Sequence, residues 1–370
     1  MERQIRISGV SVFTVRIPVR AVHSHGIGDL AASTNVILKL DTDAGITGWG
    51  EAAPWAVFTG SAEASFAALD VYLRPLLLGA DPMRVQALVL AAERSIVHCT
   101  EAKAAMEMAL LDIVGKVLGV PVCDLLGGRV RDEIPLSFSI ANPDFGADIE
   151  FVRELCRDGI RLFKVKTGFA EHREDLRRLE KLREVLPEDT EIRIDYNQGM
   201  QPWEAIRRLR DIEQFHPTFI EQPVPAENRA ALGAIALALD TPIMADESVF
   251  TPAEALHVSG EHLADLISVK IQKSGGIWRA REIAAIAAAG GLACYGGDMF
   301  ETGIACSAGT HLIAATPNIS LGCEFYQPTC YLREDLLAEP FPVKDGKVQI
   351  PSGPGLGVAV DEDRLRRYRA

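Results

Sequence analysis

The sequence lacks any closely spaced pair of cysteines, although seven cysteines are scattered through its 370 residues. None of them stands in a CxxC arrangement, and their number is odd. Neither a framework of structural disulfides nor a cysteine-rich zinc site is therefore expected. This pattern is typical of a chain that stays reduced, so we expect a cytoplasmic protein.

Long hydrophobic runs and continuous basic runs are absent as well. No stretch of roughly 18 apolar residues occurs, so no membrane partner is expected. Residues 1–10 are charged and have no apolar segment of the kind that signal peptides carry. The formal net charge is −13, and the basic residues between 177 and 183 are interleaved with the acidic residues Glu174, Asp175, Glu180 and Glu184. These features exclude a basic surface for nucleic acid.

The chain is long and apolar enough for two folded parts. Its 370 residues suit a barrel of about 250 residues with a smaller partner domain, and 48% of them are hydrophobic. Residues 5–16 and 33–42 alternate like strands, and residues 61–118 follow a helical period. We predict an α+β capping domain over 1–128, completed by about 343–370, and a catalytic barrel over 129–342.

From residue 129 onward, short apolar strands alternate with helical segments at roughly 25-residue spacing. Eight strands are predicted, at 134–140, 162–166, 191–195, 218–221, 241–246, 266–270, 292–295 and 319–322. Helices are predicted between them, for example at 173–185, 203–212 and 277–289. This alternation indicates an α/β fold with a parallel sheet that closes into a barrel.

Three successive predicted strands end in a carboxylate. Asp195, Glu221 and Asp246 lie 26 and then 25 residues apart, so neighbouring strands would present them to one point. Three such charges repel one another unless a cation neutralises them, and oxygen-only ligands select Mg²⁺ or Mn²⁺. Each acid taken alone could instead cap the helix that follows it.

Lysines stand at two of the remaining strand ends. Lys164 and Lys166 are two residues apart on one strand and so point to the same side. A second cation nearby lowers a lysine pKa, and Lys270 would reach in from the opposite side of the barrel mouth. Two such lysines suit proton transfer at a carbon next to a carboxylate. They could otherwise be exposed rim residues, which is the interpretation we favour for Lys273.

These motifs together resemble the enolase superfamily. They are Lys164-Val165-Lys166, Asp195-Tyr196-Asn197, Ile220-Glu221-Gln222-Pro223, Ala245-Asp246-Glu247-Ser248 and Lys270 with Gly275-Gly276. A lysine on the sixth strand, and Tyr295-Gly296-Gly297 in place of a histidine on the seventh, are similar to the muconate-lactonizing subgroup. The segments at 125–132 and 354–357 also resemble muconate cycloisomerases. The resemblance therefore covers essentially the whole chain.

The resemblance implies a modified (β/α)7β barrel with an N-terminal cap and a residue-by-residue assignment of the site. Asp195, Glu221 and Asp246 would bind the metal, Lys166 would be the acid/base and Lys270 the opposing lysine. Glu324 matches a further acid/base carboxylate of the family, although it could equally be the buried partner of a lysine. The family also suggests a homo-oligomer, with an octamer as one form.

The reaction implied by the resemblance is an intramolecular addition in a small carboxylate substrate. One carboxylate of cis,cis-muconate, or of a substituted muconate, adds across the far double bond. The resulting enolate is protonated by Lys166 to give the muconolactone.

Several residues are candidates for substrate contact, but each has a simpler interpretation. Asp298 stands where the family usually has threonine; facing the pocket, it would repel a dicarboxylate or attract a cation. The remaining candidates are His23, His25, Trp55, Phe58, Asn197 and Glu301. The histidines could lie at the surface, and the aromatic residues could pack the cap.

Three alternatives stay open. The same lysines would serve a racemase or epimerase of an amino-acid derivative or dipeptide, although the Asp-x-Asp pattern of dipeptide epimerases is absent on the eighth strand. Lys166 or Lys270 could form a Schiff base in a metal-free aldolase. A metal-binding barrel without chemistry is the third possibility.

Overall fold

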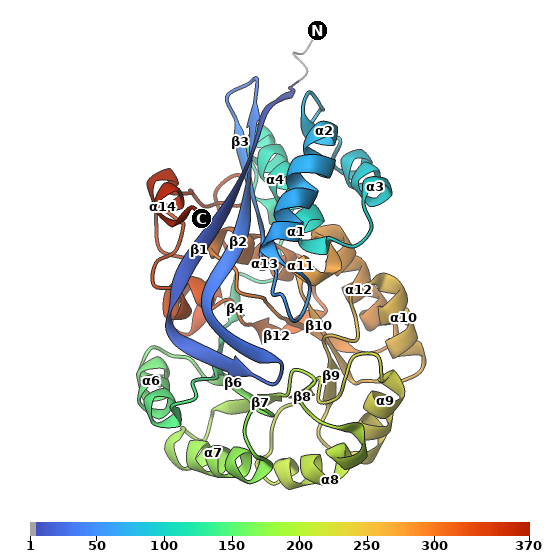
Figure 1. Cartoon of the computed structure of the whole chain (residues 1–370), viewed down its shortest axis with the longest axis vertical. Helices are drawn as coiled ribbons and strands as arrows, with labels where there is room; N and C mark the ends of the chain where they lie inside the picture. The colour runs from blue at the N-terminus through green and yellow to red at the C-terminus, as the bar shows by residue number, and fades with distance from the viewer. Residues whose placement is uncertain (1–4) are drawn as a thin grey trace.

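A computed structural model describes residues 5–370 and shows a cap above a barrel (Figure 1). The cap begins with a three-stranded antiparallel sheet formed by β1 (Ile7–His25), β2 (Gly28–Thr42) and β3 (Thr47–Ala52). Both β1 and β2 are longer than the predicted strands, because the hairpin continues past an irregularity between Pro18 and His23. The extension carries the hairpin tip down to the barrel (Figure 1).

The hairpin tip lies directly against the loop that follows the third barrel strand. A side chain at Gly26 would place its Cβ 2.2 Å from the carbonyl oxygen of Tyr196, so only glycine allows this approach. The cap thus contacts the carboxyl-terminal end of the barrel strands.

Helices cover the cap sheet, as the helical period of residues 61–118 predicts. They are α1 (Ala62–Ala67), the π-helical turn η1 (Ala68–Leu73), α2 (Arg74–Leu77), α3 (Val85–Ser95), α4 (Thr100–Leu118) and α5 (Val122–Leu125). Helix α4 is buried from Glu101 to Gly115 and packs on β3. A Cβ at Gly50 would lie 1.9 Å from the Ala105 carbonyl oxygen, so this glycine permits the close packing.

The barrel prediction is confirmed. Eight parallel strands follow one another in chain order, and an isolated bridge between Leu136 and Cys323 links the first strand region to the last. The strands are β5 (Ser137–Ile140), β6 (Leu162–Lys166), β7 (Glu191–Asp195), β8 (Ile220–Glu221), β9 (Ile243–Ala245), β10 (Leu266–Val269), β11 (Ala293–Gly296) and β12 (Ile319–Cys323). The fold is a nearly closed α/β barrel with an antiparallel cap.

Helices surround the barrel (Figure 1). They are α6 (Phe145–Arg157), α7 (His172–Val185), α8 (Pro202–Glu213), α9 (Arg229–Ala238), α10 (Pro252–Gly260), α11 (Ile271–Ser274), α12 (Ile277–Ala289) and α13 (Gly303–Ala314). Several bury one stripe, as α8 does with Ala205, Leu209 and Ile212 at helical spacing, whereas α13 is buried on every side. Within residues 5–370, no helix combines the length and apolar character needed to cross a membrane.

The end of the chain returns to the cap. After the π-helical turn η2 (Gln327–Tyr331), β13 (Val343–Lys344) and β14 (Lys347–Gln349) form a small sheet with β4 (Glu133–Pro135). Gly355 then pairs with Pro121, and α14 (Glu362–Tyr368) packs against β1. The division at residues 128 and 342, and the assignment of the tail to the cap, stay predictions; residues 1–4 lie outside the described chain.

The Asp112 carboxylate ties three segments of the chain together. It accepts hydrogen bonds from the backbone N–H of Trp49 (3.0 Å) and of Leu356 (2.9 Å), and from Lys116 Nζ (2.7 Å). We expect Asp112→Ala to lower the free energy of unfolding by about 3 kcal/mol, since two buried donors lose their acceptor. Urea unfolding followed by circular dichroism measures this change.

Asp189→Ala is the matched control, because its ion pair with Arg161 is exposed. It should change the free energy of unfolding by less than about 0.5 kcal/mol. Equal losses in both variants would contradict the role given to Asp112.

Candidate active site

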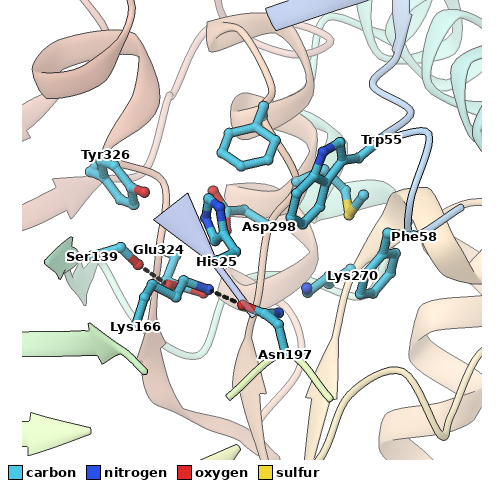
Figure 2. A pocket seen from close by; sticks show the side chains of 12 residues that line it. His25, Trp55, Phe58, Ser139, Lys166, Asn197, Lys270, Asp298, Glu324 and Tyr326 are labelled. Carbon is cyan, nitrogen blue, oxygen red and sulfur yellow. Dashed lines mark hydrogen bonds between the residues drawn. The ribbon is translucent and has the colours of Figure 1, made fainter. Parts of the chain in front are cut away.

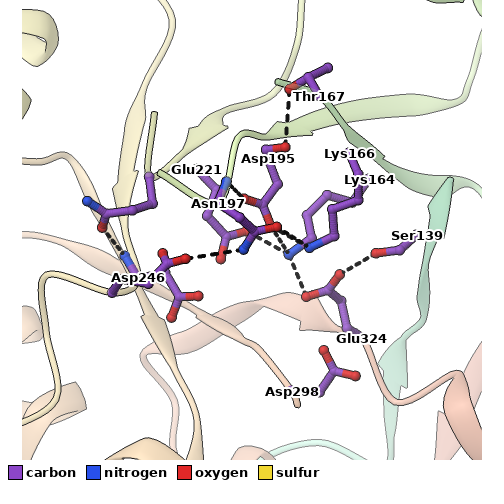
Figure 3. A network of polar contacts seen from close by, with 12 residues as sticks. Ser139, Lys164, Lys166, Thr167, Asp195, Asn197, Glu221, Asp246, Asp298 and Glu324 are labelled. Carbon is purple, nitrogen blue, oxygen red and sulfur yellow. Dashed lines mark hydrogen bonds and ion pairs between the residues drawn. The ribbon is translucent and has the colours of Figure 1, made fainter. Parts of the chain in front are cut away.

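Three buried carboxylates stand side by side where the barrel strands end (Figure 3). Asp195 is the last residue of β7, Glu221 is the last of β8, and Asp246 directly follows β9. Asp195 pairs with Glu221 in the parallel register, so the sheet itself brings these two side chains together. All three are at most 1% exposed.

The backbone just beyond these acids adopts a conformation that side chains rarely favour. Asn197 and Gln222 have φ values of 41° and 33°. Gln222 uses its side-chain oxygen to accept hydrogen bonds from the backbone N–H groups of Asp246 and Ser248. Strained residues of this kind gather where surrounding contacts fix a functional geometry.

Lys164 lies among the carboxylates rather than in the open pocket. Its Nζ is 2.6 Å from Glu221 Oε2, 2.5 Å from Glu324 Oε2 and 3.3 Å from Asp195 Oδ2. Burial disfavours its charge, but the attraction of Glu221 and Glu324 prevails and holds the Lys164 pKa well above its usual value. Lys164 is thus a fixed cation, which suits charge balance better than proton transfer.

Lys166 and Lys270 face each other across the pocket (Figure 2). Lys166 Nζ donates to Asp195 Oδ2 (2.6 Å) and Asn197 Oδ1 (3.2 Å). Lys270 Nζ donates to Asp246 Oδ2 (2.6 Å) and lies 4.7 Å from the centre of the Phe58 ring. Both residues are less than 10% exposed and line the pocket. A reacting carbon placed between them would have one amine on each face.

The interpretation of Lys273 as an exposed rim residue is wrong. Lys273 is fully buried in the short helix α11, and its Nζ donates to Asp246 Oδ1 (2.7 Å) and to the Asp246 backbone oxygen (2.6 Å). The short helix α11, which follows β10, directs the Lys273 side chain back toward the ends of the barrel strands. Position along the sequence does not indicate this reversal.

Glu324 and Asp298 form an acidic side of the pocket. Glu324 Oε1 accepts from Ser139 Oγ (2.8 Å), and its other oxygen is held by Lys164. Although burial opposes its charge, Lys164 lowers the pKa of Glu324. Asp298 also lines the pocket, so it does not face away, and it accepts a hydrogen bond from Gln327 Nε2.

The upper wall of the pocket comes from the cap and from the segments that follow β11 and β12. It consists of His25, Trp55, Phe58, Met299, Phe300 and Tyr326. His23 is buried behind this wall, 4.2 Å from the Tyr331 ring between ring centres, and does not line the pocket. Glu301 also lies behind it and accepts from the backbone N–H of Met299 (2.6 Å).

Some of the site residues escape sequence reasoning. Ser139, Met299, Phe300 and Tyr326 line the pocket, although apolar or hydroxyl side chains near strand ends carry no distinctive signal. Glu247 is buried beside Asp246 and accepts from Asn197 Nδ2 (3.2 Å). The one sequence signal for Glu247 is its position next to Asp246, an acid at a strand end.

The residues fit a bound cation, although their geometry is not that of a closed metal site. Across residues 5–370, no three His, Cys, Asp or Glu side chains are arranged to hold an ion, because lysines take up oxygens of all three acids. Glu221 Oε1 and Glu247 Oε2, however, are buried without a hydrogen-bond donor. Burial and a neighbouring aspartate raise the pKa of each of these glutamates to about 8. A divalent cation would neutralise this crowding.

Comparison with known proteins identifies the class of this barrel. Residues 147–364 match the family described as "Enolase C-terminal domain-like". Residues 7–127 match "Mandelate racemase / muconate lactonizing enzyme, N-terminal domain". The chain belongs to the mandelate racemase/muconate lactonizing enzyme family, in the muconate-lactonizing subgroup of the enolase superfamily. Muconate cycloisomerases of this superfamily depend on a divalent metal.

Three of the similar proteins are named as enzymes that act on muconate or chloromuconate. A solved muconate cycloisomerase from Azorhizobium caulinodans is 49% identical, with 98% of each chain covered and a TM-score of 0.86. A muconate lactonizing enzyme from Pseudomonas fluorescens, solved with muconolactone, is 34% identical, with 100% of both chains covered and a TM-score of 0.95. A chloromuconate cycloisomerase from Cupriavidus pinatubonensis is 33% identical over 98% of this chain and 99% of its own.

His23 should make stability depend on pH. Burial, with a smaller contribution from Lys166, lowers its pKa to about 3, whereas the unfolded chain has the usual value near 6.5. Between these values only the unfolded state takes up the proton, so this contribution to stability is lost as the pH falls. His23→Phe should remove a slope of about 1.4 kcal/mol per pH unit between roughly pH 6 and pH 4.

The slope is measured by urea unfolding at a series of pH values. His257→Gln, which removes an exposed histidine from α10, is the control and should leave the slope much closer to that of the unchanged protein. A His23→Phe protein with the original slope would show that His23 is not kept neutral by burial.

Proposed function

We propose that this protein is a metal-dependent cycloisomerase that converts cis,cis-muconate, or a substituted muconate, to the muconolactone through an enolate. The observation that carries the proposal is the pair of buried lysines, Lys166 and Lys270, on opposite sides of one pocket. Each is ion-paired with one of the buried carboxylates at the strand ends, which we call the floor of the site. The identity to muconate and chloromuconate cycloisomerases over the full chain supports the same reaction.

Asp195, Glu221 and Asp246 would hold the metal, and Mg²⁺ or Mn²⁺ suits their all-oxygen donors. When bound, the cation would neutralise the negative charge that develops on a substrate carboxylate as the enolate forms. The two buried carboxylate oxygens without donors, on Glu221 and Glu247, support a cation at this point.

The chain's own side chains would orient the substrate and move one proton. One muconate carboxylate oxygen adds to the nearer carbon of the far double bond and closes the five-membered lactone. The electron pair of that double bond passes to the adjacent carbon, which becomes the enolate carbon next to the second carboxylate. The Lys166 ammonium donates its proton to that carbon, and Asn197 holds the Lys166 amine in position.

Lys270 would face the other side of the same carbon. Its ammonium is held by Asp246 and would add positive charge near the enolate. Lys164 would favour the charged forms of Glu324 and Asp195. His25, Trp55 and Phe58 would close the pocket against water. We further expect a homo-oligomer, for which the family suggests an octamer, and a cytoplasmic location.

An assay with cis,cis-muconate tests the proposal directly. Consumption of the diene and appearance of the lactone are followed by absorbance and NMR, with Mg²⁺ or Mn²⁺ present and again after treatment with EDTA. Turnover that requires the cation supports the proposal. Metal-free turnover with trapping by borohydride would instead favour a Schiff-base aldolase.

Removing the proton donor should separate chemistry from metal binding. We expect Lys166→Ala to lower kcat by a factor of 10³ or more while the metal Kd changes by less than about fivefold, because Lys166 transfers the proton and is not a ligand. Steady-state kinetics and calorimetric metal titration measure the two effects. Lys181→Ala, an exposed lysine on α7, is the control; a large loss of metal affinity in Lys166→Ala would exclude the assigned role.

Neutralising one proposed ligand should weaken the metal site. We expect Glu221→Gln to raise the Kd for Mn²⁺ by about 10- to 100-fold, because a neutral amide oxygen replaces a charged ligand. Titration calorimetry measures this Kd, with the exposed Glu188→Gln as the matched control. An unchanged Kd in Glu221→Gln would remove Glu221 from the ligand set.

A further inference from the structure

Asp298 is a carboxylate in the pocket wall without an ionic partner. It is 8% exposed and lines the pocket together with Lys166 and Lys270. Within residues 5–370, no lysine, arginine or histidine nitrogen lies within 4.0 Å of its oxygens, and its one side-chain hydrogen bond comes from the neutral amide of Gln327. A buried charge left in this state is costly unless something else compensates it.

The surroundings of Asp298 add further negative charge. Glu324 lies on the same side of the pocket (Figure 3), and Glu301 lies behind the wall. Burial and these two glutamates raise the pKa of Asp298 well above its usual value. These surroundings disfavour the charged form of Asp298, and a positive group supplied from the pocket would restore it.

The cations of the pocket are already engaged elsewhere. Lys166 is bound to Asp195 and Lys270 to Asp246, both at the floor. Burial, and Lys166 after it, lower the pKa of His25 well below its usual value, so this histidine carries no charge at neutral pH. The wall that includes Asp298 thus offers no positive side chain for the second carboxylate of a dicarboxylate.

Aromatic rings surround the same part of the pocket. Trp55 and Phe300 meet edge to face with ring centres 5.4 Å apart, and His25 lies 4.9 Å from Trp55. Asp298 lines the same pocket as these rings, and Figure 2 shows it together with His25, Trp55 and Tyr326. Aromatic faces next to a carboxylate attract an ammonium group and offer nothing comparable to an anion.

The neighbouring glycine fixes Asp298 close to one of the reacting lysines. A Cβ at Gly297 would lie 2.7 Å from Lys270 Cε, so the Lys270 side chain packs on the backbone just before Asp298. Asp298 and Lys270 line one pocket, so a positive group held by Asp298 would share it with the carbon that Lys270 faces. That proximity matches a nitrogen attached directly to the carbon next to the carboxylate.

We propose that Asp298 and the rings of Trp55, Phe300 and Tyr326 form a cation subsite, through which the enzyme also binds small amino acids with a positively charged α-nitrogen and racemises them. This second activity rests on the proposed function, because it uses the same two lysines and the same carboxylate-binding floor. Asp298 acts here as a specificity-determining residue.

The second reaction needs no partner besides the two lysines. One of them, as a neutral amine, removes the α-proton, and the electron pair of the C–H bond passes into the enolate of the carboxylate. The other, as an ammonium ion, returns a proton to the opposite face of the carbon. The products are the inverted amino acid and the enzyme with its proton moved from one lysine to the other.

Exchange of the α-proton in D₂O tests the subsite. We use the Mn²⁺-loaded full-length enzyme for kinetics and the Mg²⁺-loaded enzyme for NMR, with two probes of similar size. N,N-dimethyl-L-alanine carries a positive nitrogen, and N-acetyl-L-alanine carries a neutral one. The subsite predicts exchange and inversion of the dimethyl compound at least about tenfold faster than of the acetyl compound; equal rates, or the reverse order, would overturn it.

Asp298→Asn keeps the shape of the side chain and removes its charge. We expect it to lower kcat/KM for the dimethyl compound by at least tenfold, to leave the rate with the acetyl compound within about threefold, and to lower the KM for muconate several-fold. Opposite changes with two substrates cannot come from a folding defect. A loss of similar size with all three substrates would overturn the proposal, and exposed Asp189→Asn serves as the control.

The two proposals can fail separately. Muconate turnover without exchange of the dimethyl compound would refute the cation subsite and leave the cycloisomerase intact. Exchange of the dimethyl compound that Lys166→Ala abolishes, without muconate turnover, would support the subsite and refute the cycloisomerase. Absence of both reactions in the metal-loaded enzyme would refute both.

Discussion

The ion pairing between buried carboxylates and lysines at the carboxyl ends of the barrel strands is the interaction on which this site depends. Asp195, Glu221 and Asp246 are almost completely removed from water, and isolated charges there would be strongly disfavoured. Lys164 and Lys273 hold fixed positions in this network, each fully buried against an acid. This balance holds negative charge in place for chemistry that requires it.

The same network separates two kinds of lysine. Lys164 and Lys273 are enclosed on all sides, whereas Lys166 and Lys270 each bind one acid and still reach the open pocket. A lysine can serve in proton transfer only where a substrate can reach it, so accessibility divides structural from reactive amines. The cap covers the side of the site where Lys166 and Lys270 are accessible. Its β1–β2 hairpin brings His25 over the strand ends, which limits access by water.

In the proposed reactions, specificity would come from the pocket wall that includes Asp298 and the aromatic rings. The floor would hold a substrate carboxylate and set the position of the reacting carbon in any reaction that passes through an enolate. The wall would then decide which second group of the substrate is tolerated. The proposed cycloisomerisation and racemisation share the floor and make different demands on this wall.

The sequence by itself determined the barrel, most strand positions and the three acids with Lys166 and Lys270 at the strand ends. Strand–helix alternation is a local signal, and β6 and β7 begin and end where the pattern predicts. Only the tertiary structure decided that Lys273 turns inward, that His23 lies behind the wall, that Asp298 faces the pocket, and that Ser139 and Tyr326 join it. Side-chain direction after a strand depends on turns and on packing between segments far apart in the chain, which no local pattern encodes.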